Sequence, residues 1–133
     1  MSEKACETVG IVTKRLITLT KFYVDGSGWN GKESKACVTD ENGRLLELII
    51  TNEKRTNNQM EYQALFTALM LAKNGDTIFT DSRLIIGHLT KNWNINAEHL
   101  KMIIETCQKL MKMKNINLAW IPRNKNKAGK VFE

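Results

Sequence analysis

Three acidic residues, Asp25, Glu61 and Asp81, occupy positions in the sequence from which they could act together on a metal ion. Asp25 ends a run of β-branched and aromatic residues, Asp81 follows a short apolar run, and Glu61 falls near the start of an expected helix. Carboxylates that lie close together repel one another, and a divalent cation relieves that repulsion. Because ligands that are all oxygen favour Mg²⁺ or Mn²⁺ over zinc, one of these two ions is expected.

Each of these acids also has a purely structural interpretation. Asp25 precedes a glycine and could be a turn residue, Glu61 could respond to the helix dipole in a first helical turn, and Asp81 could cap the next helix. Singly, each acid is better explained in that way. Only their convergence in the folded chain would point to a metal site.

The elements that must position these acids can be read from the hydrophobic pattern. Apolar and β-branched runs predict five strands, at residues 16–25, 34–40, 44–51, 77–80 and 116–121. Apolar positions that recur every three or four residues predict three helices, at residues 57–73, 82–91 and 97–113. Thr56 is expected to cap the first helix and Asn74–Gly75 to end it, while Glu41-Asn42-Gly43 is expected to form a tight hairpin turn.

The order of these elements predicts a mixed α/β sheet with strand order 3-2-1-4-5. The first three strands form an antiparallel meander, so the first and third strands end at the same edge. The helix at 57–73 then crosses the sheet, and the strand at 77–80 returns parallel to the first strand through a right-handed connection. Neighbouring strands lie about 4.8 Å apart, so Asp25 and Asp81 should meet at one edge, with Glu61 beside them.

Composition limits the class of protein. A chain of 133 residues with 42% hydrophobic content supports one domain, which is expected at residues 17–133 after a partly disordered extension at 1–16. The three cysteines, Cys6, Cys37 and Cys107, are widely spaced and are expected to be reduced. No apolar stretch reaches the length of a membrane span, and no signal sequence is evident, so a cytoplasmic monomer without a small-molecule cofactor is expected.

The net charge of +6 is concentrated near the C-terminus. Residues 1–100 contain 12 Lys and Arg and 12 Asp and Glu, whereas residues 101–133 contain 8 Lys and Arg against Glu105 and Glu133. A polyanionic partner would be attracted to this last quarter of the chain. On charge alone, a solvated basic helix face is an equally good interpretation.

Four segments, in order along the chain, resemble type 1 ribonuclease H. These segments are Tyr23-Val24-Asp25-Gly26-Ser27-Gly28, Thr56-Asn57-Asn58-Gln59-Met60-Glu61, Phe79-Thr80-Asp81-Ser82, and Trp120-Ile121-Pro122-Arg123 with Asn126-Lys127-Ala128. The resemblance covers nearly the whole chain from about residue 17, and it implies the ribonuclease H-like fold with helices flanking a five-stranded sheet.

The resemblance also implies an activity and a set of site residues. The expected reaction is hydrolysis of the RNA strand of RNA/DNA hybrids by two divalent ions, which leaves 5′-phosphate and 3′-hydroxyl ends. Asp25 would bridge both ions, and Glu61 and Asp81 would complete their coordination. Asn57 and Asn58 would face the minor groove, where RNA can be told from DNA. The full set of expected nucleic-acid contacts is Gly26, Ser27, Asn57, Asn58, Ser82, Arg123 and Asn126.

One position departs from the pattern of this family. The fourth acid of the family would immediately follow Ala128, and this chain has Gly129 there. Asn124, Asn126 or Glu133 could substitute, with Glu133 one helical turn beyond Gly129, or water and substrate phosphate could complete the coordination. The departure leaves a second hypothesis open, a catalytically weak or inactive hybrid-binding domain. A third is a different nuclease of the same fold, such as a transposase or resolvase core, although the segment from Thr56 to Glu61 argues against it.

Overall fold

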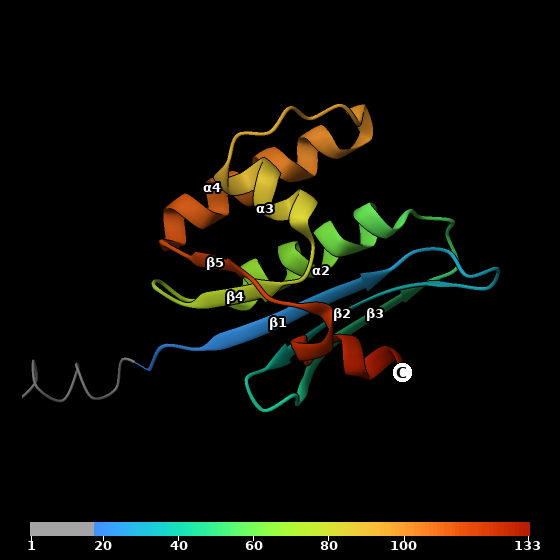
Figure 1. Cartoon of the computed structure of the whole chain (residues 1–133), viewed down its shortest axis with the longest axis horizontal. Helices are drawn as coiled ribbons and strands as arrows, with labels where there is room; N and C mark the ends of the chain where they lie inside the picture. Colours follow the sequence, from blue (N-terminus) through green and yellow to red (C-terminus); the bar gives the residue numbers. More distant parts are fainter. Residues whose placement is uncertain (1–17) are drawn as a thin grey trace, which may run out of the picture.

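A twisted five-stranded sheet with strand order β3-β2-β1-β4-β5 runs through the centre of the computed structural model, which describes residues 18–133 (Figure 1). The strands are β1 (Lys21–Ser27), β2 (Ser34–Asp40), β3 (Leu45–Thr51), β4 (Thr77–Thr80) and β5 (Asn117–Trp120). β1, β2 and β3 are antiparallel, and β4 and β5 are parallel to β1. The predicted fold class and strand order are confirmed, and the predicted extension at residues 1–16 lies outside the described residues.

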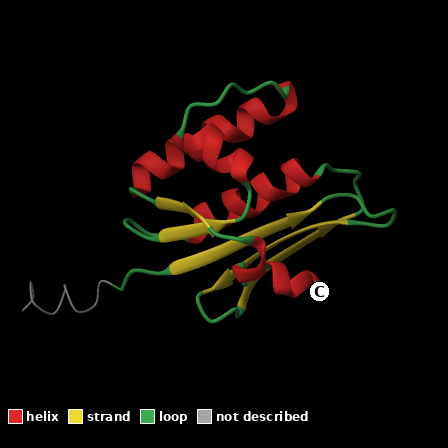
Figure 2. Cartoon of the chain, viewed as in Figure 1, coloured by secondary structure: helices red, strands yellow, loops and turns green. Residues whose placement is uncertain are grey.

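The helices are α2 (Asn57–Leu71), α3 (Arg83–Thr90) and α4 (Lys101–Lys114), with 3₁₀ turns at Glu98–Leu100, Arg123–Lys125 and Gly129–Phe132. The three α-helices lie on one side of the sheet, and the last two 3₁₀ turns lie on the other (Figures 1 and 2). The main core forms between the sheet and α2, where Val24 and Val38 pack against fully buried helix residues such as Leu65. A smaller cluster around Tyr23, Cys37 and Ala128 holds the C-terminal turns against the opposite face.

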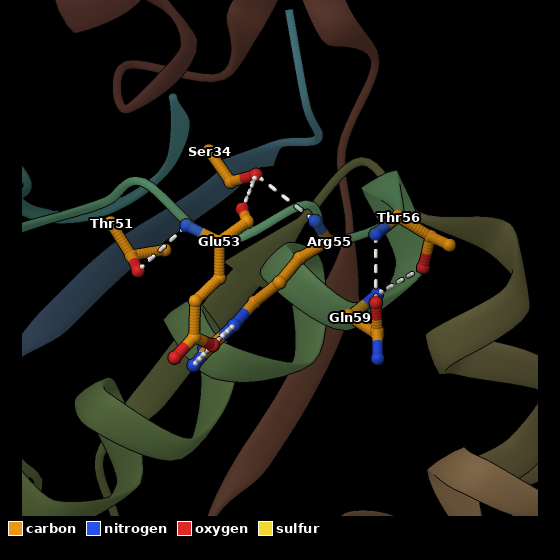
Figure 3. A network of polar contacts seen from close by, with 6 residues as sticks. All are labelled: Ser34, Thr51, Glu53, Arg55, Thr56 and Gln59. Carbon is orange, nitrogen blue, oxygen red and sulfur yellow. Dashed lines mark hydrogen bonds and ion pairs between the residues drawn. The ribbon is translucent and has the colours of Figure 1, made fainter. Parts of the chain in front are cut away.

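Local sequence signals account for most element boundaries. Thr56 caps α2 as expected, and with Gln59 it forms a capping box, since each side chain accepts a hydrogen bond from the backbone N–H of the other residue (Figure 3). Ser82 caps α3 through Ile85 N–H. In the turn between β2 and β3, Gly43 takes a positive φ of +80°, which glycine adopts without strain.

Several predicted boundaries differ from the structure. α2 ends at Leu71 with Ala72 as its C-cap, so the helix predicted to residue 73 is shorter and Asn74–Gly75 is not its end. Among the described residues β1 begins at Lys21, so residues 18–20 of the strand predicted at 16–25 lie outside it, and Thr20 N–H donates to Asp76 Oδ1. The helix predicted from residue 97 opens with a 3₁₀ turn before α4. The strand predicted at 116–121 is shortened to Asn117–Trp120. Among residues 18–133, no helix combines the length and hydropathy that crossing a membrane requires.

Candidate metal centre

The side chains of Asp25, Glu61 and Asp81 meet at one edge of the sheet. Asp25 lies near the end of β1, Glu61 is the fifth residue of α2, and Asp81 directly follows β4. One carboxylate oxygen from each residue lies within 4.8 Å of those of the other two. The structure therefore brings together the three acids that the topology predicted would converge.

None of the three acids has the purely structural role that its local sequence suggests. Asp25 is paired with Cys37 within the β1–β2 ladder and is not a turn residue. A carboxylate gains most from the helix dipole in the first turn of a helix, and Glu61 lies beyond the first turn of α2. The N-cap of α3 is Ser82, so the carboxylate of Asp81 is not the capping group.

Two oxygens of this cluster are buried without a partner. Asp25 and Glu61 are only 2% and 7% exposed. Within the described part of the chain, Asp25 Oδ1 and Glu61 Oε2 have no hydrogen-bond donor. Buried carboxylate oxygens that receive no hydrogen bond are costly, and a divalent cation would supply the missing interaction. The donor set is all oxygen, which fits Mg²⁺ or Mn²⁺.

The pKa shifts of the cluster also fit a site for a divalent cation. Burial, followed by the charges of Asp25 and Asp81, raises the pKa of Glu61 to about 9. Burial and the charge of Asp81 raise the pKa of Asp25, against the lowering effects of a hydrogen bond with Glu61 and the charge of Arg123. A pKa of about 9 favours the protonated form of Glu61 at neutral pH when no cation is bound, and a bound cation would favour release of that proton.

A glycine allows α2 to approach β1 closely enough for Glu61 to reach Asp25. A Cβ added at Gly26 would lie 2.2 Å from the backbone carbon of Met60 and 2.3 Å from the backbone nitrogen of Glu61. No side chain fits between strand and helix at this point. A glycine inside a strand is a sequence signal for such a close approach, and Gly26 is the residue that carries it here.

The C-terminal segment holds Asp81. Asn126 Nδ2 donates to Asp81 Oδ2 at 2.9 Å, and Trp120 Nε1 donates to the Asp81 carbonyl at 3.1 Å. The Arg83 guanidinium lies over the Trp120 ring, 4.3 Å from its centre. The hydrogen bond between Asn126 and Asp81 spans 45 positions in the sequence and was not anticipated from it.

Gly129 borders the site, as the sequence pattern predicts for the fourth position. A Cβ at Gly129 would lie 3.3 Å from Asp25 Oδ2. The two residues line a pocket of about 310 Å³ together with Ser27, Arg123, Phe132 and Glu133.

The candidate substitutes for the fourth acid are placed differently from one another. Glu133 shares this pocket, but it follows a 3₁₀ turn and not the expected α-helical turn. Asn126 presents its amide nitrogen to Asp81, so its oxygen is not directed at the cluster. Asn124 is exposed within the 3₁₀ turn at Arg123–Lys125.

The expected nucleic-acid contacts have distinct environments. Asn57 Oδ1 accepts a hydrogen bond of 2.7 Å from Gly28 N–H, which ties the loop after β1 to the start of α2. Asn58 is exposed, and Arg123 is exposed and lines the same pocket as Asp25. Ser82 uses its hydroxyl to cap α3.

The loop that leads into α2 is held by a network of polar contacts around Ser34 (Figure 3). Ser34 Oγ donates to the Glu53 carbonyl at 2.9 Å and accepts from Arg55 N–H at 3.2 Å. The Arg55 side chain also pairs with Glu53 at 2.7 Å. Because Ser34 is fully buried, this network fixes the point from which Asn57 and Asn58 project.

Comparison with known proteins agrees with the geometry. A family model described as RNase H matches residues 18–130. The N-terminal RNase H domain of a Mycobacterium tuberculosis protein, solved as a fusion with maltose-binding protein, has 22% sequence identity and a TM-score of 0.64 over 80% of this chain and 84% of that one.

Two further solved structures share the fold. RNase H1 from the halophilic archaeon Halobacterium salinarum NRC-1 has 22% identity and a TM-score of 0.65, over 86% of this chain and 93% of its own. LC11-RNase H1, isolated from compost by a metagenomic approach, was solved in complex with an RNA/DNA hybrid. It has 25% identity and a TM-score of 0.60, over 80% of this chain and 88% of its own.

Proposed function

Because this chain belongs to the RNase H family, we propose that it is a metal-dependent endoribonuclease that hydrolyses the RNA strand of RNA/DNA hybrids and leaves 5′-phosphate and 3′-hydroxyl ends. The observation that carries this proposal is the cluster of Asp25, Glu61 and Asp81, whose oxygens lie within 4.8 Å of one another. The two buried oxygens without a hydrogen-bond donor, on Asp25 and Glu61, mark where the positive charge is needed.

Asp25, Glu61 and Asp81 are proposed to hold two Mg²⁺ or Mn²⁺ ions when substrate is bound. Such ions provide an activated water as nucleophile and stabilise the negative charge that develops on the departing 3′ oxygen. Asp25 lies close both to the other two acids and to Gly129. Its burial keeps bulk water from competing for its oxygens.

The proposed substrate follows from the surroundings of the cluster. Asn58 and the free amide hydrogens of Asn57 would contact the minor groove of the hybrid, where 2′-hydroxyls are exposed. Arg123 lies beside the carboxylates and would contact a backbone phosphate near the reacting bond. The LC11-RNase H1 structure provides a family precedent for binding to an RNA/DNA hybrid.

Cleavage of a labelled hybrid tests the proposal directly. The protein should cut the RNA strand in Mg²⁺ or in Mn²⁺, and an Asp25→Asn variant should not. End-group analysis of the products should find 5′-phosphates. Absence of cleavage above the Asp25→Asn background in both metals would contradict the proposal.

The same assay separates the competing hypotheses. Salt-sensitive binding of the hybrid without cleavage would indicate a hybrid-binding domain, in keeping with the glycine at position 129. Preferential cutting of duplex DNA would indicate a different nuclease of this fold. A hybrid, a duplex DNA and a duplex RNA of the same sequence should therefore be compared at one salt concentration.

A further inference from the structure

Asn126 is buried between the two strands that carry aspartates of the cluster. It is 0% exposed, and its side chain makes three hydrogen bonds. Nδ2 donates to the Val24 carbonyl and to Asp81 Oδ2, both at 2.9 Å. Oδ1 accepts from Ala128 N–H at 3.1 Å. Asn126 thereby links β1, the residue after β4 and the C-terminal turn.

The direction of this amide is determined by its partners. Ala128 N–H can only donate, so the amide oxygen must face it. The Val24 carbonyl and the Asp81 carboxylate can only accept, so the NH₂ group must face them. The reversed amide would place oxygen against two acceptors and would leave Ala128 N–H without a partner.

The amide controls the orientation of the Asp81 carboxylate. A carboxylate at the end of a short side chain rotates easily, and one charge-assisted hydrogen bond to Oδ2 restricts that rotation. Asn126 engages only Oδ2, so Oδ1 is left to bind a metal ion. Since Val24 directly precedes Asp25, the same NH₂ group also sets the spacing between the ends of β1 and β4.

We propose that Asn126 is a positioning residue that orients Asp81 for metal binding, and is neither a metal ligand nor a contact to nucleic acid. This inference rests on the proposed function, because it assigns Asp81 as a ligand. It departs from the expectation that Asn126 could replace the missing fourth acid, since the amide oxygen is already committed to Ala128.

Metal binding measured without substrate provides the first test. We expect Asn126→Ala to weaken binding of Mn²⁺, measured by titration calorimetry, by about 10- to 100-fold, as for other residues that orient a metal ligand. In cleavage assays the variant should need more Mg²⁺ for half-maximal rate, while KM for the hybrid at saturating metal stays within about twofold, because no substrate contact is removed.

A matched control separates positioning from a general loss of stability. Tyr62→Phe also removes a buried hydrogen bond, the one of 2.8 Å between Tyr62 Oη and His88 Nδ1, which links α2 to α3 and involves no carboxylate. It should lower the free energy of unfolding without changing Mn²⁺ affinity. Equal weakening of Mn²⁺ binding in both variants would show that Asn126 acts only through stability.

A double-mutant cycle tests whether Asn126 acts through Asp81. In an Asp81→Asn background, Asn126→Ala should cause no further loss of Mn²⁺ affinity, because the carboxylate that it orients is gone. Loss of the same size in both backgrounds would overturn the proposal.

If Asn126→Ala does not fold, the unmodified protein still tests the inference. The side-chain NH₂ resonances of Asn126 should shift in a Mg²⁺ titration with the same midpoint as metal binding, and no response to Mg²⁺ would overturn it. Failure of the unmodified protein to cleave the hybrid in either metal would instead contradict the proposed function. Unchanged Mn²⁺ binding by Asn126→Ala, in a protein that does cleave, would contradict this inference alone.

Discussion

Gly129 lies against Asp25, so that a Cβ on the glycine would be 3.3 Å from Oδ2 of the aspartate. This distance is tight but not prohibitive, and Asp25 would have to move by only a few tenths of an ångström. A fourth acidic ligand could approach the cluster from position 129, but glycine provides only backbone there and no carboxylate.

Replacing Gly129 by aspartate should add this ligand. We expect Gly129→Asp to strengthen Mg²⁺ binding and to raise the rate of hybrid cleavage at limiting metal, on the order of tenfold or more. Without metal, the variant should melt at a lower temperature than the unmodified protein, because a fourth carboxylate adds repulsion. Thermal unfolding with and without Mg²⁺, together with the cleavage rate, provides the measurement.

Gly129→Ala is the control, since it adds the Cβ without the charge. It should share the small steric cost but not the gain in metal affinity. An unchanged cleavage rate in Gly129→Asp would mean that the glycine does not limit this protein.

Removing one charge from the cluster should stabilise the metal-free protein. Asp25→Asn removes the repulsion between Asp25 and Asp81, and it gives the buried position a group able to donate a hydrogen bond. We expect a gain of about 1–2 kcal/mol in the free energy of unfolding without metal, comparable to satisfying one buried polar group. The stabilisation by Mg²⁺ should be lost at the same time. Denaturant unfolding with EDTA and with Mg²⁺ measures both effects, and a less stable metal-free variant would contradict this account.

The raised pKa of Glu61, about 9, predicts a pH dependence of stability. Between the ordinary pKa of a glutamate and about 9, the folded metal-free protein holds a proton that the unfolded chain has released. The free energy of unfolding should therefore fall as pH rises through this window, and Glu61→Gln should flatten the slope. Unfolding measured in EDTA from pH 5 to pH 9 tests the sign, and a slope unaffected by Glu61→Gln would refute the assignment.

Metal binding should release this proton. Between pH 7 and 8, the calorimetric enthalpy of Mg²⁺ binding should depend on the ionisation enthalpy of the buffer, because the proton of Glu61 is transferred to it. Glu61→Gln should remove that dependence. Buffer-independent enthalpies for the unmodified protein would show that Glu61 is already ionised before metal binds.

A lysine from α4 stabilises the end of α2. Lys114 Nζ donates to the carbonyls of Leu69 at 2.6 Å and Ala72 at 2.9 Å, where the helix dipole favours a positive charge. We expect Lys114→Met to lower the free energy of unfolding by about 1–2 kcal/mol without altering metal affinity. Lys112→Met removes an exposed charge from α4 and should lower the free energy of unfolding by less than about 0.5 kcal/mol. Similar losses in the two variants would argue against the capping role.

The two asparagines at the start of α2 should differ in their effects. Asn58 is exposed, so Asn58→Ala should raise KM for the hybrid several-fold and leave thermal stability unchanged. Asn57 also accepts the hydrogen bond from Gly28 N–H, so Asn57→Ala should raise KM and lower stability by about 1 kcal/mol. Michaelis–Menten and melting measurements on both variants separate substrate contact from loop anchoring. A normal KM in Asn58→Ala would remove it from the proposed substrate surface.

Several features of this protein were determined by the sequence alone. Hydrophobic spacing predicted the strands and helices, Thr56 with its neighbours marked the start of α2, and Gly43 marked the hairpin turn. These features are local, because propensity, caps and turns act over a few residues. The order of the elements then led to the sheet edge where Asp25 and Asp81 meet, since strand direction and connection rules leave few topologies.

Only the tertiary structure decided how the site is completed. Three features of the site depend on residues far apart in the chain. They are the carboxylate oxygens that lack a hydrogen-bond donor, the direction of the Asn126 amide, and the contact of Gly129 with Asp25. The bond between Asn126 and Val24, for example, joins residues 102 positions apart. Packing of the C-terminal 3₁₀ turns against the sheet sets these distances to within fractions of an ångström, and no local propensity encodes them.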